Sequence, residues 1–288
     1  MTDKYAVIGN PIAHSKSPQI HTMFAEQAIQ DMDYVAIEAP LDCFAATIER
    51  LRAESYKGCN VTVPFKFEAF QLATRLTPRA QAALAVNTLK FDGATILGDN
   101  TDGAGLLADI ERNLGFALRG KRVLLMGAGG AAYGVALPLL NASAIITVAN
   151  RAEDKARQLA AAFQAHGTIQ GGGYAALKGA QFDCVINATS SSLSDELPPL
   201  PRRDEIPPRF ALFPFAKGGL GGIFAPGALA YDLVYGRETP FMKFAREQGA
   251  AKISDGLGML VEQAAASFFL WRGVRPDTAP VLAELRQP

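Results

Sequence analysis

The sequence has little that would mark a secreted, metal-binding or nucleic-acid-binding protein. Of its 288 residues only three are cysteines, Cys43, Cys59 and Cys184. Their wide spacing fits neither a disulfide framework nor a zinc motif. Lysine plus arginine and aspartate plus glutamate each total 28, so no basic excess draws the chain to nucleic acid or to an anionic membrane. We therefore expect a cytoplasmic protein with no metal and no nucleic-acid partner.

One long stretch without charge raises the question of a membrane span. No charged residue occurs from Val123 to Asn150, and about 20 apolar residues suffice to cross a bilayer. The stretch holds four glycines, Pro138 and Asn141, so two buried strands around a buried helix explain it better. The N-terminus shows no basic segment followed by an apolar one. We expect neither a membrane span nor a signal peptide.

What the sequence does have is a repeated alternation of strand and helix patterns. Hydrophobic residues make up 49% of the chain, and its length corresponds to about two domains at roughly 150 residues each. We predict strands over 5–8, 34–37 and 58–63, a helix capped by Ser17, and another over 41–54. The second half predicts helices over 103–114, 131–140, 153–166 and 258–272, with strands over 122–126, 145–149, 183–187 and 229–235. This alternation predicts α/β domains with mainly parallel sheets.

Two glycine-rich or proline-rich segments interrupt the alternation. The glycines at 171–173 predict a loop. The stretch from Pro198 to Pro226 is dense in proline and glycine and is far longer than the usual connection of about 4–6 residues. We predict a long irregular excursion there.

The most specific local pattern is a glycine-rich turn between a strand and a helix. After the strand ending at Met126 the chain reads Gly127-Ala-Gly129-Gly-Ala-Ala132. Gly127 permits the tight turn, Gly129 lets the backbone approach a pyrophosphate at the helix N-terminus, and Ala132 allows close packing. The pattern predicts a dinucleotide site.

An arginine after the next strand indicates which dinucleotide. Arg151 follows Asn150 at the position where an acidic residue would bind the ribose of NAD, and an arginine there suits the 2′-phosphate of NADP. Lys155, one helical turn further, adds positive charge. A solvated basic cluster at a helix start would also explain these residues.

Polar residues in the first half form a second group. Ser15 and Ser17 precede a helix, where hydroxyl and free N–H groups suit a carboxylate, although capping alone would explain Ser17. Asn60 and Thr62 are expected on one face of a strand. Lys66 falls near a helix start, which favours release of its proton and suits an acid–base role. A surface lysine is the plain alternative.

Three further polar residues are indecisive when taken singly. Asp102 precedes a helix and is a natural N-cap. Asn87 lies before a predicted strand. Gln263 lies on an otherwise apolar helix stripe and needs a hydrogen-bond partner if it is buried.

Together these segments resemble the shikimate dehydrogenase family over nearly the whole chain. The matching segments, in the family's order, are 9–18, 60–66, 87–88, 100–103, 127–131, 150–151, 187–190, 231–235 and 255–263. The resemblance implies NADPH-dependent, reversible reduction of 3-dehydroshikimate to shikimate in aromatic amino-acid biosynthesis. It implies a substrate domain over 1–102 completed by 257–288, a Rossmann-type NADP domain over 103–256, and a cleft between them.

The resemblance also assigns roles to residues. Lys66 and Asp102 resemble the catalytic pair. The residues similar to substrate ligands are Ser15 and Ser17 for the carboxylate and Asn60, Thr62, Asn87, Tyr235 and Gln263 for the ring hydroxyls. The residues similar to cofactor ligands are Gly127, Ala128, Gly129, Gly130, Ala131, Asn150, Arg151, Lys155, Thr189, Leu233, Gly256 and Met259.

Some features depart from the family pattern or leave alternatives open. Residue 22 is Thr where Asn is frequent, Ala152 lacks the hydroxyl of a common Thr, and about 202–222 is an apparent insertion. An NAD-dependent quinate/shikimate dehydrogenase and a non-catalytic ligand sensor are the alternatives; Arg151 disfavours the first and the Lys66–Asp102 pair the second. The oligomeric state stays open, with a homodimer as one option.

Overall fold

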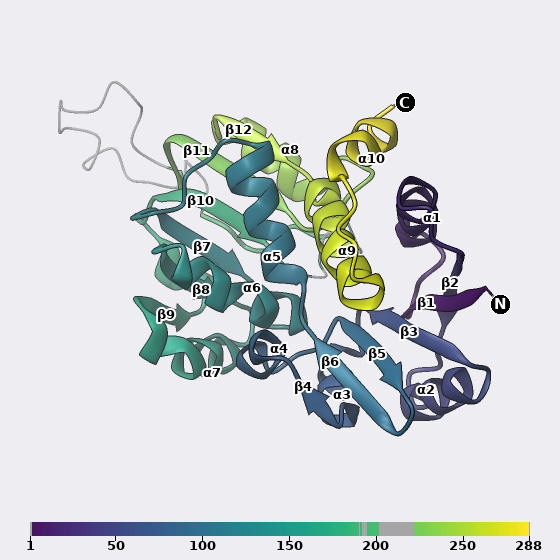
Figure 1. Ribbon diagram of the computed structural model, residues 1–288. Helices are drawn as coiled ribbons and strands as arrows, with labels where there is room; N and C mark the ends of the chain where they lie inside the picture. The colour runs from purple at the N-terminus through teal and green to yellow at the C-terminus, as the bar shows by residue number, and fades with distance from the viewer. Residues whose placement is uncertain (1, 190, 192–194, 202–221, 288) are drawn as a thin grey trace, which may run out of the picture. The chain divides into compact units, whose positions relative to one another are not determined.

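The computed structural model describes residues 2–189, 191, 195–201 and 222–287. The chain divides into two compact units, each with its own sheet (Figure 1). Unit 1 comprises Met1–Asn113, Tyr133–Leu137 and Gly258–Pro288, and unit 2 comprises Leu114–Ala132 and Pro138–Leu257. The predicted excursion over 198–226 and the apparent insertion lie largely outside the described residues.

Unit 1 is built on a mixed sheet. Its strands, in spatial order, are β2 (Met32–Glu38), β1 (Asp3–Gly9), β3 (Tyr56–Val61), β5 (Thr88–Asp92), β6 (Thr95–Asp99) and β4 (Arg75–Leu76). β1 pairs in parallel with β2 and β3, but β5 is antiparallel to both β3 and β6. β4 pairs in parallel with β6, so three of the five pairings are parallel and two are antiparallel. The antiparallel pairings arise at β5, because β5 and β6 form a hairpin at residues 93–94 instead of a helical crossover.

Helices complete unit 1. They are α1 (Ser17–Gln27), α2 (Phe44–Ala53), α3 (Lys66–Leu72), α4 (Pro78–Ala83), α5 (Asp102–Leu107) with a π-helical segment (Ala108–Asn113), α9 (Leu257–Arg272) and α10 (Thr278–Leu285). α2 starts at Phe44, three residues later than predicted, because Cys43 is its cap position. The core under these helices includes Ile8, Phe44 and Phe65.

Two predicted helix caps are wrong by one residue. The cap of α1 is Lys16 and the cap of α5 is Thr101, so Ser17 and Asp102 are the first residues inside their helices. At α1 the Ser15 hydroxyl accepts from the Ser17 N–H at 3.2 Å. The Ser15 side chain thus satisfies one of the backbone N–H groups at the start of α1 that have no partner within the helix.

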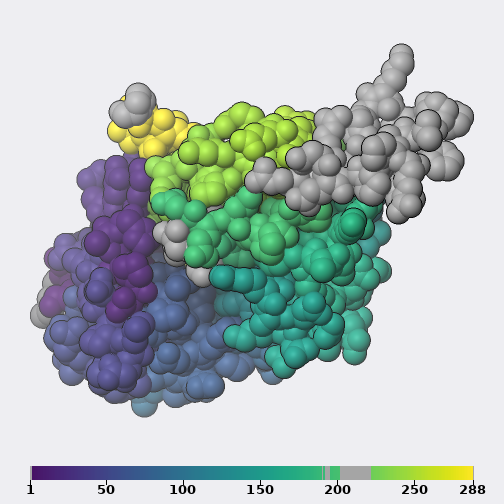
Figure 2. Space-filling model, turned by 180° about the vertical axis from the view of Figure 1, so that it is seen from behind, coloured from purple at the N-terminus to yellow at the C-terminus, as the bar shows by residue number. Residues whose placement is uncertain are grey.

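The C-terminal segment of the chain packs beside α1. The backbone N–H of Asp277, the cap of α10, donates to Gln27 Oε1 at 2.7 Å. Figure 2 shows the yellow C-terminal residues next to the purple N-terminal segment. This contact joins residues 250 positions apart.

Unit 2 is built on a parallel sheet. Its strands, in spatial order, are β12 (Lys252–Ser254), β11 (Phe224–Asp232), β10 (Phe182–Asn187), β7 (Arg122–Met126), β8 (Ile145–Ala149) and β9 (Ile169–Gly172). All their described pairings are parallel. The helices are α6 (Gly130–Asn141), α7 (Glu153–Phe163), extended by the 3-10 turn Gln164–His166, and α8 (Pro240–Glu247), with a further 3-10 turn, Tyr174–Leu177.

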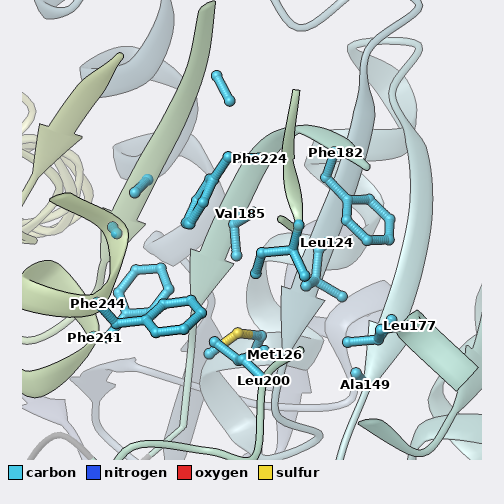
Figure 3. Packing of buried hydrophobic residues seen from close by; sticks show 14 of the residues in the cluster. Leu124, Met126, Ala149, Leu177, Phe182, Val185, Leu200, Phe224, Phe241 and Phe244 are labelled. Atoms are coloured by element: carbon cyan, nitrogen blue, oxygen red, sulfur yellow. The ribbon is translucent and has the colours of Figure 1, made fainter. Parts of the chain in front are cut away.

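Unit 2 has an apolar cluster between α8 and the sheet, and one segment of this unit that was predicted as a loop is a strand. Figure 3 shows Phe241 and Phe244 of α8 in one apolar cluster with Met126 of β7. The central strands β7 and β10 are buried along nearly their whole length, as strands covered on both faces are, so they read as continuous apolar runs. The loop predicted at 171–173 is wrong, since β9 pairs with β8 through Gly172. Gly171 is required there, because a Cβ would lie 2.2 Å from the Ala156 carbonyl oxygen.

The uncharged stretch is resolved as predicted into β7, α6 and β8. Within the described part of the chain, none of the helices has both the length and the apolar character that crossing a membrane requires.

Candidate functional site

In unit 1 the predicted substrate residues gather where adjacent strands end. β1 and β3 are parallel neighbours, so the loops after Gly9 and Val61 leave the same edge of the sheet. The Thr62 N–H donates to the Ile8 carbonyl at 2.9 Å. Thr62 lies beyond the end of β3, so its expected place on a strand face with Asn60 is wrong. It lies instead in the half-buried segment that leads into α3.

The serines are held at the start of α1. Ser15 is half-buried and Ser17 is buried. The turn that carries them is closed by a hydrogen bond from the Ser15 N–H to the Ile12 carbonyl at 2.9 Å. Two hydroxyls next to a helix N-terminus suit a carboxylate, because the first N–H groups of a helix favour negative charge.

Lys66 and Asp102 form a buried ion pair. Lys66 begins α3 and Asp102 begins α5, and the Lys66 ammonium donates to Asp102 Oδ2. Their side chains are 11% and 5% exposed. Lys66 is therefore not the snorkelling surface lysine that the sequence left open, and Asp102 does more than stand at a helix start.

Asn87 joins this pair to the surrounding polar groups. Its Nδ2 donates to Asp102 Oδ1 and to Thr101 Oγ1, each at 2.8 Å. Its Oδ1 accepts from the Thr101 backbone N–H at 2.9 Å. Because a backbone N–H can only donate, this bond determines which end of the Asn87 amide faces Asp102.

Gln263 reaches the same place from α9. Its Nε2 donates to the Leu260 carbonyl at 2.7 Å, and its Oε1 accepts from Asn87 Nδ2 and Thr101 Oγ1, each at 3.3 Å. The partner that a buried glutamine requires is therefore present. Gly105 of α5 makes room for this approach, since a Cβ would lie 2.7 Å from the Gln263 Cβ.

Asn60 is also brought to the site, but its amide is used inside the protein. Its Oδ1 accepts from the Tyr34 hydroxyl at 2.7 Å. Its Nδ2 lies 3.2 Å from the Asn87 carbonyl, 3.1 Å from Thr88 Oγ1 and 3.0 Å from Ser267 Oγ. Both ends of the amide thus have protein partners.

In unit 2 the predicted cofactor residues lie at the carboxyl ends of the parallel strands. Gly127 follows β7 with φ +104°, and a Cβ there would lie 2.9 Å from the Ala188 carbonyl oxygen. At Gly129 a Cβ would meet nothing within 4 Å among the described atoms. Gly129 caps α6, which begins at Gly130, so Ala128, Gly130 and Ala131 also belong to this turn. The free space at Gly129 leaves the N-terminus of α6 open, as an anion site made of backbone N–H groups requires.

The predicted 2′-phosphate residues follow β8. Asn150 Nδ2 donates to the Ala152 carbonyl at 3.0 Å. The Arg151 side chain is 76% exposed, with Glu196 Oε2 at 3.7 Å. Lys155 is exposed in the first turn of α7. An arginine with so loose an ion pair is available to bind an anion.

The remaining cofactor residues follow neighbouring strands. Thr189 Oγ1 donates to Asn187 Oδ1 at 2.6 Å after β10, and the Leu233 N–H donates to the Asn187 carbonyl at 3.0 Å after β11. Gly256 follows β12, and a Cβ there would lie 2.2 Å from the Leu233 carbonyl oxygen. Ligands of open parallel sheets bind at this edge.

One predicted site residue lies elsewhere than its pattern indicated. Tyr235 is half-buried and lies beyond β11, which ends at Asp232, so the predicted strand to 235 is too long. Met259 lies in α9, on the predicted helix, and is buried in unit 1.

Sequence reasoning missed several polar residues of the unit 1 site. Tyr34, Thr88, Thr101 and Ser267 are buried and hydrogen-bonded to Asn60, Asn87 or Gln263. Thr88 and Thr101 lie inside segments that carry the resemblance, which is the one signal that pointed toward them. Tyr34 and Ser267 stand in apolar patterns that predict core positions.

A dinucleotide-type glycine turn in one unit and a buried lysine–aspartate pair in the other are typical of a two-domain α/β dehydrogenase. Family models match along the chain: the shikimate dehydrogenase substrate binding domain over 7–89, shikimate/quinate 5-dehydrogenase over 109–194, and the shikimate 5′-dehydrogenase C-terminal domain over 256–286. The chain is 56% identical over 286 residues, 99% of each chain, to shikimate dehydrogenase (NADP(+)) of Methylobacillus flagellatus. It belongs to the shikimate dehydrogenase family, as the resemblance predicts.

Solved structures agree with this family and with the predicted α/β fold. An Ael1 enzyme from Pseudomonas putida is 48% identical with a TM-score of 0.82, over 100% of this chain and 99% of that chain. Shikimate 5-dehydrogenase of Thermus thermophilus, solved in complex with NADP(H) and shikimate, is 30% identical with a TM-score of 0.81, over 99% of each chain.

Proposed function

We propose that this chain is an NADP-dependent shikimate dehydrogenase, which reversibly reduces 3-dehydroshikimate to shikimate in the cytoplasm. The buried Lys66–Asp102 pair carries the proposal, because it places an acid–base group and its carboxylate partner at the end of the unit 1 sheet. In this proposal residues 1–102 with 257–288 bind the substrate, and 103–256 bind NADP.

The residues of unit 2 fit NADP. The turn at Gly127 and Gly129 offers the open start of α6 to a pyrophosphate, and the exposed Arg151 guanidinium offers a fork to the 2′-phosphate. Thr189, Leu233 and Gly256 would line the nicotinamide end, with Met259 supplied by α9. When bound, NADPH supplies a hydride to the ketone carbon of the substrate.

Residues of unit 1 hold the substrate and move the proton. Ser15 and Ser17 bind its carboxylate, and Thr62, Asn87 and Gln263 bind its ring hydroxyls. As the ketone oxygen gains negative charge, the Lys66 ammonium donates a proton to it, which completes the hydroxyl. In the reverse direction neutral Lys66 takes that proton back. Asp102 holds the Lys66 nitrogen in place and accepts from a ring hydroxyl.

Selectivity follows from the same polar groups. A buried amide that loses its hydroxyl partner keeps its desolvation cost, so substrates lacking one ring hydroxyl are rejected strongly. Quinate carries an additional substituent, so it tests whether the site also rejects a substrate with an extra group.

A paired steady-state assay tests the function. The purified full chain is assayed with shikimate and with quinate, each with NADP and with NAD, and Lys66→Met serves as the matched inactive variant. We expect turnover of shikimate with NADP that exceeds every other combination. Preference for NAD with either substrate would favour the quinate/shikimate alternative, and shikimate binding without turnover would favour the sensor; both outcomes overturn the proposal.

A further inference from the structure

The unit 1 site has a row of hydrogen bonds that starts at Tyr34 and ends at Asp102, the partner of Lys66. The Tyr34 hydroxyl donates to Asn60 Oδ1, Asn60 Nδ2 donates to Thr88 Oγ1, and Thr88 Oγ1 donates to Asn87 Oδ1 at 2.8 Å. Asn87 Nδ2 then donates to Asp102 Oδ1. Each of these five side chains is buried, with Tyr34 at 8% the most exposed.

The direction of every bond in this row is determined. Asn60 Nδ2 also lies against the Asn87 carbonyl, which can only accept, so Asn60 Oδ1 must face Tyr34. The Tyr34 hydroxyl is therefore the donor. Thr88 accepts from Asn60 and donates onward to Asn87. Hydrogen bonds that run in one direction polarise one another, so the row acts as a unit.

The sheet holds the first part of the row in register. Asn60 of β3 and Thr88 of β5 are directly paired in the antiparallel ladder. Ser267 of α9 also contacts the row, with its Oγ 2.8 Å from Thr88 Oγ1. A change at Tyr34 is therefore transmitted through a rigid element and not through a loop.

The aromatic ring of Tyr34 is held in place by a stacked ring. His21 of α1 is fully buried and stacks on it, with ring centroids 4.1 Å apart and an interplanar angle of 9°. Burial lowers the pKa of His21 to about 3, so the ring is uncharged at neutral pH and supports the Tyr34 ring by stacking.

We infer that Tyr34 and Thr88 are positioning residues, which act through Asn60 and Asn87 to hold the Asp102 carboxylate and hence the Lys66 ammonium. This inference rests on the proposed function. It also gives Asn60 a role in this row: with both ends of its amide bound inside the protein, Asn60 helps to orient Asn87. If the Asn87 amide turned over, its oxygen would face Asp102 Oδ1 and two acceptors would repel each other.

The test removes one hydroxyl at a time. Tyr34→Phe keeps the ring on His21 but removes the first donor, and Thr88→Val keeps the shape but breaks the row. We expect each to lower kcat for shikimate about 10-fold, less than the roughly 100-fold loss that a misplacement of about 1 Å can cause, because the Thr101 N–H still holds Asn87. KM for shikimate should change less than kcat, about threefold at most, since Ser15, Ser17 and Thr62 lie outside the row and only Asn87 and Asp102 within it also bind ring hydroxyls.

Three matched variants keep the result interpretable. Thr88→Ser restores the hydroxyl and should restore kcat. Tyr56→Phe, on the same strand as Asn60, removes a tyrosine hydroxyl outside the row and should leave kcat at the wild-type value. The double variant of Tyr34→Phe with Thr88→Val should be little slower than the slower single variant, because both break one row.

The outcomes separate the inference from the function beneath it. Wild-type kcat in both Tyr34→Phe and Thr88→Val, or a loss in Thr88→Ser as large as in Thr88→Val, would overturn the inference while shikimate turnover by the wild type upholds the function. Absence of turnover in the wild type would overturn the function first.

Discussion

Replacing Lys66 by methionine tests the acid–base pair at its centre. The side chain keeps its length and apolar stem but loses the ammonium that donates to Asp102. Acid–base groups contribute about 10²–10⁴-fold to turnover. We therefore expect kcat to fall by at least about 100-fold, with a much smaller change in the KM for NADP, because Lys66 belongs to the unit that does not carry the glycine turn.

The same variant should be measurably less stable. Removing one partner of a buried ion pair costs about 3–5 kcal/mol, because the other charge is left buried. Asp102 retains the Asn87 amide at 2.8 Å, so we expect the lower end, about 3 kcal/mol. At 1.36 kcal/mol per tenfold, that is about a 100-fold rise in the unfolding constant.

Two measurements check these effects separately. Initial rates of NADPH formation give kcat, and urea denaturation gives the free energy of unfolding. Lys57→Met is the control, since Lys57 is an exposed lysine of β3 in the same unit. A double variant with Asp102→Ala should be no slower than the slower single variant and should lose less stability than the two single losses added together.

Either of two results would refute the reasoning. If folded Lys66→Met retains more than about a tenth of wild-type kcat, the proton travels by another route, since the expected loss is larger. If its free energy of unfolding equals that of Lys57→Met, the ion pair is not buried in solution as the structure has it.

Further predictions concern binding and pH. Arg151→Ala should weaken NADP by about 10- to 150-fold, as loss of a charged hydrogen bond of about 1.5–3 kcal/mol implies, and leave NAD nearly unchanged; comparing the KM of both cofactors checks this. Glu196→Gln should tighten NADP slightly, by at most about fivefold, because the weak ion pair with Arg151 competes with the phosphate. Ser15→Ala should raise the KM for shikimate about 10-fold with kcat nearly unchanged. Burial lowers the pKa of His21 from 6.5 to about 3, so as the pH falls the unfolded chain takes up this proton before the folded chain does. The free energy of unfolding is therefore expected to fall by about 1.4 kcal/mol per pH unit between pH 6.5 and pH 3. Urea denaturation across this range should show a shallower dependence of the unfolding free energy on pH in His21→Phe.

Each of these predictions has a contrary result. Equal losses for NADP and NAD would remove the 2′-phosphate role of Arg151, and weaker NADP binding in Glu196→Gln would make Glu196 part of the site. A loss of kcat without a change in KM would move Ser15 from binding to catalysis. Parallel pH curves for wild type and His21→Phe would mean that the pKa of His21 is the same in the folded and unfolded chain.

Local pattern was sufficient where the chemistry is local. The turn at Gly127, the strand before it and the arginine at 151 lie within about one βαβ unit, so spacing alone identifies them. Boundaries were less certain, because caps depend on neighbouring loops: Lys16 and Thr101 hold the cap positions that Ser17 and Asp102 were expected to hold.

The amino-acid sequence by itself indicated the two α/β halves, the glycine turn between a strand and a helix, and the family, because each has a periodicity or motif in adjacent residues. It pointed to Lys66 and Asp102 through the family resemblance, and the structure joins these two side chains in an ion pair. Tertiary structure alone decided which polar groups support that pair. Asn60 and Thr88 are paired because β5 runs antiparallel beside β3, Tyr34 reaches Asn60 from β2, and Ser267 joins them across 207 residues from Asn60. A single buried hydroxyl on an apolar stripe reads as core in any local pattern. Such a hydroxyl acquires its hydrogen-bond partner, and hence its role, when strands and helices from distant parts of the chain pack together.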